Sequence, residues 1–234
     1  MAMAEHSTIT VKDGSFQAYR AEPAGDGPIP AIIVVQEIFG VNAGIRAKAD
    51  RWANEGYLAL APDLFWRQGA GIELDADQPD QFQRALGLMQ QSNLDEAVGD
   101  IEATIRAARA HPRSNGRVGL VGFCWGGLLA YLAAARTDVN ASVGYYGVNI
   151  DTYLREAHAI ANPLMLHIAG KDGFVPPEKQ AAVHAALDPN PHVTIHDYPE
   201  QDHAFAREFG AKRHPEAAEL ADGRTRAFFA QHLS

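Results

Sequence analysis

The 234-residue sequence predicts an α/β fold, with a mainly parallel central β-sheet, helices on both of its faces and an N-terminal hairpin. Short β-branched runs alternate with helical patterns almost throughout, which is typical of βαβ units with right-handed crossovers. Residues 31–35 form a continuous apolar run, as expected for a central parallel strand buried on both faces. A glycine-rich turn within residues 119–127 then joins an apolar strand directly to a helix. Because no long polar linker interrupts the chain, we predict one domain over residues 1–234.

The elements of the N-terminal half follow from hydrophobic periodicity and from turn residues. The Asp13-Gly14 turn joins two short strands into the expected hairpin. Gly56 is expected to end a helix, and Pro62 to close the strand after it. A loop rich in glycine, aspartate and aromatic residues follows at residues 63–78. The predicted strands are residues 8–11, 16–20, 31–35 and 57–61, and the predicted helices are residues 45–55, 81–91 and 94–110.

The C-terminal half continues the same alternation after the glycine-rich turn. An alanine-rich segment after that turn predicts a helix, and each later apolar run is separated from the next by a helical pattern. The predicted strands are residues 141–147, 163–169 and 192–198, and the predicted helices are residues 128–136, 151–157, 177–186 and 215–233.

The composition excludes several classes of partner. A net charge of −9, with no basic run to offset it, argues against binding to nucleic acid. The N-terminus lacks the pattern of a signal peptide, and the longest apolar run is far too short to span a bilayer. A single cysteine cannot form an internal disulfide, which fits a reducing compartment. We therefore expect a cytoplasmic protein that acts on a small molecule, and a monomer, although the sequence leaves an oligomer open.

Cys124, the one cysteine, lies in the glycine-rich turn, within the sequence Gly122-Phe123-Cys124-Trp125-Gly126. Nucleophiles in hydrolases often sit at such a strained strand-to-helix turn, with glycines two residues before and after them. The pattern predicts that this thiol is an attacking group. The alternative is a buried structural cysteine, since free cysteine is among the most buried residue types.

Asp172 and His203 could complete a catalytic triad. Each follows a predicted strand, in the chain order nucleophile, acid, histidine that is known for this kind of turn. An Asp-Gly turn or a loop histidine is common by itself, but the three together, in order and at strand ends, favour a triad. His196 is a rival base, but it lies within a predicted strand. His192 and His196 would bring two metal ligands together on a helix but not on a strand, so no metal is expected.

The segment after the first central strand, Gln36-Glu37-Ile38-Phe39, supplies further candidates. The backbone N–H groups of Ile38, or of a neighbour, and of Trp125 are in the positions that stabilise an oxyanion in such folds. Glu37 is either an ordinary surface carboxylate or a group that hydrogen-bonds the thiol and accepts its proton.

With these residues, the sequence resembles the dienelactone hydrolases (carboxymethylenebutenolidases). The resemblance spans almost the whole chain, and the cysteine elbow together with Gln-Glu-Ile-Phe-Gly is its most specific part. It implies an α/β-hydrolase fold, a Cys-His-Asp triad, no cofactor, and opening of the lactone ring of dienelactone to maleylacetate during bacterial degradation of aromatic compounds. The shared motifs are residues 36–42, 62–64, 67–68, 98–100, 114–116, 119–127, 144–148, 172–176 and 203–207.

The resemblance implies a role for each site residue. Cys124 would attack the lactone carbonyl, His203 would serve the thiolate and later activate water, and Asp172 would orient His203. Glu37 would hold the thiol neutral until the substrate arrives and then accept its proton. Arg207 would bind the substrate carboxylate, because a guanidinium fork suits a planar carboxylate.

The chain also departs from the family pattern. An ungapped alignment puts Phe82 where the family has a second arginine, and Leu86 and Met89 where it has bulkier aromatic residues. Loss of one charge-assisted contact removes about 1.5–3 kcal/mol, which weakens binding of a carboxylate by one or two orders of magnitude. Arg84 or Arg67 could compensate if either reaches the pocket. The implied substrate-binding residues are Arg207, Tyr145, Phe39, Phe82 and Met89.

Three alternatives to a dienelactone hydrolase remain from the sequence. The altered residue at Phe82 favours a general hydrolase of small esters or other lactones. A non-catalytic binding scaffold would keep the fold but have an unreactive Cys124. A thiol sensor is the weakest alternative, since the chain has no second cysteine to resolve an oxidised one.

Overall fold

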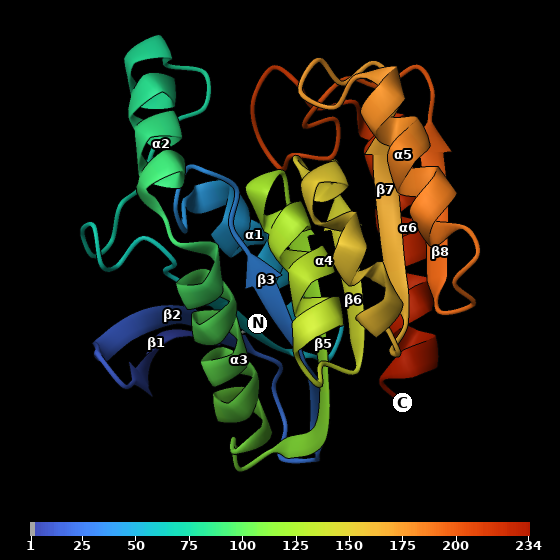
Figure 1. Ribbon diagram of the computed structural model, residues 1–234. Helices are drawn as coiled ribbons and strands as arrows, with labels where there is room; N and C mark the ends of the chain where they lie inside the picture. Colours follow the sequence, from blue (N-terminus) through green and yellow to red (C-terminus); the bar gives the residue numbers. More distant parts are fainter. Residues whose placement is uncertain (1–2) are drawn as a thin grey trace.

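The computed structural model describes residues 3–234, and its centre is an eight-stranded sheet with the order β1-β2-β4-β3-β5-β6-β7-β8 (Figure 1). The strands from β4 to β8 run parallel to one another, and the β1–β2 hairpin joins them antiparallel through β2. The mainly parallel sheet and its N-terminal hairpin are therefore as predicted. The strands are β1 (Met3–Val11), β2 (Gly14–Glu22), β3 (Ile29–Val35), β4 (Leu58–Pro62), β5 (Ser114–Phe123), β6 (Ala141–Tyr145), β7 (Leu164–Ala169) and β8 (Val193–Tyr198).

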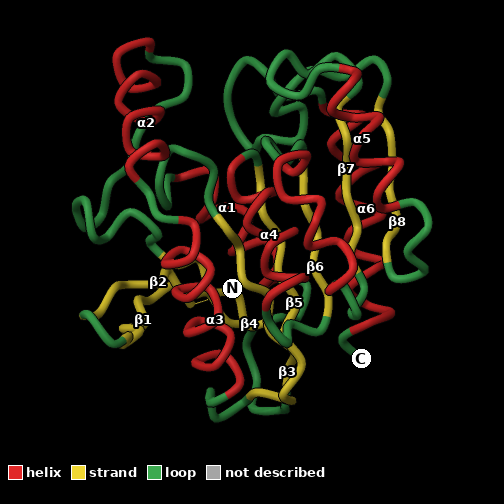
Figure 2. Tube along the Cα trace, in the orientation of Figure 1, coloured by secondary structure: helices red, strands yellow, loops and turns green. Residues whose placement is uncertain are grey.

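Helices cover both faces of the sheet. In Figure 1, α3, α4 and α5 lie in front of the strands, and α1 and α6 lie behind them. Helix α2 stands apart, beyond the edge at which the parallel strands end (Figure 2). None of the helices within residues 3–234 is long and apolar enough to cross a bilayer. The helices are α1 (Ala43–Asn54), α2 (Pro79–Gln91), α3 (Leu94–Arg109), α4 (Trp125–Arg136), α5 (Pro177–Leu187) and α6 (Pro215–His232), with the 3₁₀ helix η1 (Ile150–Ala159).

Strand β3 shows why the core needs continuous apolar runs. Ile33 and Val35 pack into a cluster with residues of α3 and α4, whereas Ile32 and Val34 pack into a second cluster with residues of α1 and α6. Successive side chains of a strand point to opposite faces, so a strand that is covered on both faces must be apolar at every position. This explains the β-branched run of the sequence.

Two elements differ from the sequence predictions. The hairpin strands β1 and β2 are longer than expected, and they pair from Met3↔Glu22 to Val11↔Gly14. Their outer residues are mostly polar, so backbone pairing and not hydrophobic alternation extends them. The helix expected at residues 151–157 is the 3₁₀ helix η1, which begins after Asn149 in a left-handed conformation. Ile150 is its one buried residue among those described, and such a weak apolar stripe does not distinguish an α-helix from 3₁₀ turns.

The carboxyl ends of the parallel strands meet at one edge, where most of the long loops gather (Figure 2). Ligand sites in open α/β sheets form at this edge. The loops after β3, β5, β7 and β8 lie there, and these are the loops that carry the predicted site residues.

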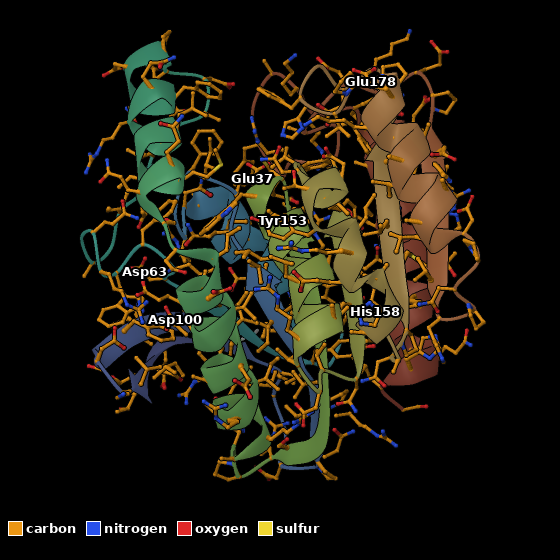
Figure 3. The ribbon with its side chains drawn as sticks, viewed as in Figure 1. Glu37, Asp63, Asp100, Tyr153, His158 and Glu178 are labelled. Carbon is orange, nitrogen blue, oxygen red and sulfur yellow. The ribbon has the colours of Figure 1, made fainter. Side chains whose placement is uncertain are left out.

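Asp100 and Arg67, from two of the shared motifs, form an ion pair that anchors the loop after β4, and only its carboxylate is buried. The guanidinium of Arg67 donates to both carboxylate oxygens of Asp100, at 2.6 and 3.1 Å, and the indole N–H of Trp66 donates to the same carboxylate at 2.8 Å. Asp63 accepts hydrogen bonds from two backbone N–H groups of its own loop. Asp100 is a residue of α3, and both acids lie below the edge that carries Glu37 (Figure 3). These motif residues therefore position a loop, and Arg67 is not available to a substrate.

Candidate active site

Cys124 occupies the turn between β5 and α4, as the sequence predicts. Its backbone has φ 57° and ψ −115°, a conformation that L residues rarely adopt and that costs about 1–3 kcal/mol. The Cys124 N–H donates to the carbonyl of Tyr145 at 3.0 Å, and its carbonyl accepts from the N–H groups of Gly127 and Leu128. The turn therefore holds the thiol rigidly at the carboxyl edge of the sheet, with only 8% of the residue exposed.

Two glycines make this tight turn possible. A Cβ atom on Gly122 would lie 1.9 Å from the carbonyl oxygen of Gly126. A Cβ atom on Gly126 would lie 2.5 Å from the carbonyl oxygen of Gln36, on the neighbouring strand's loop. Real Cβ contacts are never this short, so strand, helix and loop can meet around the thiol only because both positions lack a side chain.

His203 and Asp172 form a buried pair beside the thiol. His203 Nδ1 lies 2.7 Å from Asp172 Oδ2, and the other Asp172 oxygen accepts from the Phe174 N–H at 2.8 Å. Burial by itself lowers the pKa of His203, but the Cys124 sulfur and the Asp172 carboxylate outweigh it and raise that pKa to about 10. Two aromatic rings pack against the imidazole, because Tyr146 and Phe174 lie edge-on to it at centroid distances of 5.1 and 4.8 Å. The surroundings therefore stabilise an imidazolium next to the sulfur.

Glu37 and Arg207 form a second buried pair. Arg207 Nε donates to Glu37 Oε2 at 2.8 Å, and Arg207 Nη2 lies 3.5 Å from Oε1. Burial lowers the pKa of Arg207, but the Glu37 carboxylate more than restores the charged form, and the net shift is upward. The family resemblance implies separate partners for these residues, the thiol for Glu37 and a substrate carboxylate for Arg207. In the structure they bond each other, so either expected role requires the pair to open.

The backbone N–H groups of Ile38 and Trp125 remain the candidates for an oxyanion hole. Trp125 is the first residue of α4, so its N–H has no carbonyl one turn earlier to bond within the helix. Its side chain is in the core, where it stacks on Phe65 at a centroid distance of 5.4 Å. Gln36 steadies the segment that carries Ile38, because its side chain bonds the Glu37 carbonyl and the Leu64 N–H.

A cavity of about 130 Å³ lies over Cys124 and His203, and we call it the apolar pocket. The structure places Phe39, Phe82 and Met89 on its wall, with the rings of Phe39 and Phe82 6.0 Å apart. Arg84 is exposed and does not line it, so neither candidate arginine substitutes for the one that the family pattern has at Phe82. The residues that line the apolar pocket are Ile38, Phe39, Phe82, Leu86, Met89, Cys124, Val148, Asn149, Phe174, His203 and Arg207.

Tyr145 does not line the pocket, and its expected role in substrate binding is wrong. Its side chain is buried on the α6 face of the sheet, where its hydroxyl bonds Asp222 at 2.9 Å and Thr225 at 2.6 Å. Thr225 also bonds His167, at 3.0 Å, so the tyrosine belongs to a buried polar network. The following residue, Tyr146, faces the site instead. Tyr146 lies just after the end of β6 and has a positive φ of 38°, so strand alternation alone does not decide where its side chain points.

Sequence reasoning also missed Phe174, Val148 and Asn149. Phe174 is 52% exposed although it is large and apolar, and it covers one side of His203 at the mouth of the pocket. Its position two residues after Asp172, on the acid's own loop, is the signal that could have pointed to it. Val148 and Asn149 follow β6 and reach the same wall, but their residue types carry no comparable signal.

His196 lies in β8, and its ring stacks on His167 at a centroid distance of 5.8 Å. Among residues 3–234, no group of three or more histidine, cysteine, aspartate or glutamate side chains is placed to hold a metal ion.

Comparison with known proteins assigns this arrangement to a family. The model of the Dienelactone hydrolase family matches residues 16–233. A relative from Azospirillum brasilense, provisionally named carboxymethylenebutenolidase, is 49% identical over 94% of this chain and 95% of its own. The carboxymethylenebutenolidase of Pseudomonas putida is 40% identical over 97% of each chain. A crystal structure from Klebsiella pneumoniae, provisionally named a dienelactone hydrolase, has a TM-score of 0.87 and 33% identity over 99% of each chain. The chain therefore belongs to the dienelactone hydrolase family and is a carboxylic ester hydrolase with the α/β-hydrolase fold.

Proposed function

We propose that the protein hydrolyses a small carboxylate-bearing lactone through a thiol acyl-enzyme on Cys124, with dienelactone, opened to maleylacetate, as the leading substrate. The observation that carries the proposal is the 2.7 Å His203–Asp172 pair beside a thiol on a strained turn. The dienelactone hydrolase family supports the same reaction type.

The arrangement suits a two-step reaction. The Cys124 thiolate attacks the carbonyl carbon, while the N–H groups of Ile38 and Trp125 stabilise the oxyanion. The ring C–O bond then breaks, and the leaving oxygen takes a proton from the His203 imidazolium. Neutral His203 next takes a proton from water, whose oxygen attacks the thioester and releases the acid and the thiolate. Asp172 fixes the imidazole tautomer throughout.

Glu37 and Arg207 would couple this chemistry to binding. A substrate carboxylate that takes the guanidinium fork of Arg207 competes with Glu37 for the same donors. The Glu37 carboxylate, once released, can turn toward the thiol and accept its proton, and it returns that proton to the sulfur after the product has left. We infer that a substrate with a carboxylate promotes attack by the Cys124 thiol in this way, whereas a neutral ester leaves the Glu37–Arg207 ion pair intact.

A general hydrolase of small neutral esters is the second candidate. The observation that favours it is Phe82, which gives the apolar pocket an aromatic wall where the family pattern has an arginine. Arg207 is the one guanidinium among the described residues that line this pocket, and it is already paired with Glu37.

Steady-state kinetics on cis- and trans-dienelactone and on p-nitrophenyl acetate and butyrate separate the two candidates. A higher kcat/KM for either dienelactone isomer supports the proposal, and a preference for the neutral esters supports the second candidate. Absence of turnover of all four would contradict both. Under the proposal we also expect a single-domain cytoplasmic enzyme that needs no cofactor and that acts in the degradation of aromatic compounds.

A further inference from the structure

An open cavity of about 480 Å³ lies on the face of the sheet that α6 covers, beside the outermost strand β8 (Figure 1). We call it the basic groove. It shares no residue with the apolar pocket, and its volume is in the range of sites that bind whole small molecules. The polar part of its wall is formed by His192, Thr194, His196, Arg224, Gln231 and His232.

Two sequence periods bring the side chains of the basic groove together. Thr194 and His196 are two residues apart on β8, so they face the same side of the sheet. Arg224, Phe228 and Gln231 are four and three residues apart on α6, so they lie on one side of the helix. These two surfaces adjoin at the groove. His196, which takes no part in the active site, therefore belongs to a second group of polar side chains.

Arg224 is half-buried on the wall of the basic groove, and no acid offsets its charge. Its Nη1 donates to the Tyr198 hydroxyl at 3.1 Å, and its guanidinium lies 5.5 Å from the centre of the Tyr198 ring. Within residues 3–234 no carboxylate pairs with Arg224, whereas Arg226, on the same helix, pairs with Glu219 at 2.6 Å. The other N–H groups of Arg224 bond no described residue and are not buried, so they are free to bind a ligand.

The wall as a whole favours an anion. None of the described aspartates and glutamates lines the basic groove, although the chain has 29 acidic residues and a net charge of −9. Asp197, the one acid of β8, is held outside the groove by His184 of α5, whose Nε2 lies 3.1 Å from its carboxylate. Burial and the nearby charge of Arg224 lower the pKa of His196, and Asp197 does not offset them. A guanidinium beside an imidazole, with no acid between them, is stabilised by an oxyanion.

Packing holds the imidazoles of the basic groove in place. The His196 ring stacks on His167 at a centroid distance of 5.8 Å, and the His232 ring lies edge-on to Phe228 at 4.7 Å. Donors that are already ordered lose less entropy when a ligand binds. Met165 and Phe228 line the groove beside these donors, so the ligand would combine an oxyanion with an apolar body.

We propose that the basic groove binds a phosphate monoester of a small organic molecule, with the phosphate on Arg224, His196 and Thr194 and the organic part against Met165 and Phe228. A phosphate group presents three strong acceptor oxygens and so uses more donors than a carboxylate does. A wall that offers guanidinium, imidazole and hydroxyl donors together suits the phosphate better. The proposal does not rest on the proposed function, because the groove contains no residue of the apolar pocket.

Calorimetric titration of the full chain with phenyl phosphate, benzoate and benzyl alcohol, at one ionic strength, tests this. The three probes share a phenyl ring and differ in the polar group. We expect phenyl phosphate to bind at least tenfold more tightly than benzoate, and benzyl alcohol to bind most weakly. Equal or tighter binding of benzoate overturns the phosphate assignment, and equal or tighter binding of benzyl alcohol overturns an anion site of any kind.

Two variants locate the bound phosphate. Arg224→Met should lower the affinity for phenyl phosphate at least tenfold, because loss of a charge-assisted hydrogen bond typically weakens binding by one to two orders of magnitude. Thr194→Val should lower it at least threefold. Thr194 is exposed on the edge strand and valine is also β-branched, so this variant should fold even if the Arg224 variant does not.

Arg226→Met is the matched control, because it removes the same charge from the same helix outside the basic groove. We expect this variant to bind phenyl phosphate as the wild type does. Wild-type affinity in both groove variants would mean that the phosphate binds elsewhere, which overturns the proposal. An equal loss of affinity in the Arg226 and Arg224 variants would also overturn it, since the effect would then follow net charge and not the groove.

Discussion

The apolar pocket and a second, larger cavity of about 510 Å³ share the side chain of Arg207, but the rest of their linings differ. The pocket holds the thiol and the imidazole among Phe39, Phe82, Met89 and other apolar side chains. The larger cavity is lined mainly by charged and polar side chains, which include Glu37 and Glu208. Charge interactions are stronger where water is excluded, so the pocket suits bond making and breaking. Neither Cys124 nor His203 lines the larger cavity, so a reaction at the thiol would take place in the pocket.

Substitution of the reacting groups in the apolar pocket should lower the activity more than any other change. We expect Cys124→Ala and His203→Ala each to lower kcat/KM for a lactone or ester by about 10³-fold or more, because the members of a triad act as one unit. Circular dichroism and thermal unfolding should show that both variants keep the fold. Turnover close to that of the wild type, in either variant, would remove that residue from the mechanism.

A positive charge added to the apolar pocket should increase its preference for carboxylate substrates. In Phe82→Arg protein, a second guanidinium would replace an aromatic ring of the pocket wall. We expect kcat/KM for dienelactone, relative to a p-nitrophenyl ester, to rise by about one to two orders of magnitude. Arg84→Ala is the control, because Arg84 is exposed and outside the pocket. An unchanged ratio in the Phe82 variant would mean that the substrate does not direct its carboxylate to this wall.

The pH titration of His203 has the smallest expected effect, and it tests only the groups that surround the imidazole. Burial lowers the pKa of His203, yet the Cys124 sulfur and Asp172 raise it to about 10. Because the shift is upward, the imidazolium persists through neutral pH, and ester turnover should fall only as the pH rises through that value. NMR of the ring Cε1–H should show a midpoint above the ordinary value of 6.5, and a lower midpoint in Cys124→Ala and in Asp172→Asn. A midpoint that neither substitution moves would contradict the assigned causes.

The sequence predicts best what local chain geometry determines. Cys124, Asp172 and His203 were found because each lies at the end of an apolar run, where glycine spacing or a turn marks the loop. The Glu37–Arg207 pair was not found, since its members are 170 residues apart and each has a plausible partner elsewhere. Lys48 was missed for a related reason, because a lysine within a helix usually reaches solvent. Its burial over the Phe123 ring, 4.5 Å from the centroid, depends on the packing of α1 against the sheet.

The sequence also predicts the ends of strands less well than their centres. The continuous run of β3 identifies a strand that is covered on both faces, but the polar ends of β1 and β2 carry no such pattern. Tyr145 and Tyr146 are adjacent and identical in type, and only the exact end of β6 decides which of them faces the site. Distant pairing and element ends are therefore the parts that required three-dimensional coordinates.

The buried network around Tyr145 has a consequence for how the protein is made. The Tyr145 hydroxyl bonds Asp222 and Thr225, and Thr225 also bonds His167 Nε2, although these residues are 77, 80 and 58 positions apart in the chain. A nascent chain that ends before α6 lacks these partners, and each unsatisfied buried group costs about 1–3 kcal/mol. Tyr145 also supplies the carbonyl that receives the Cys124 N–H. The strand that braces the thiol is therefore fully bonded only after α6 has been synthesised and has packed against the sheet.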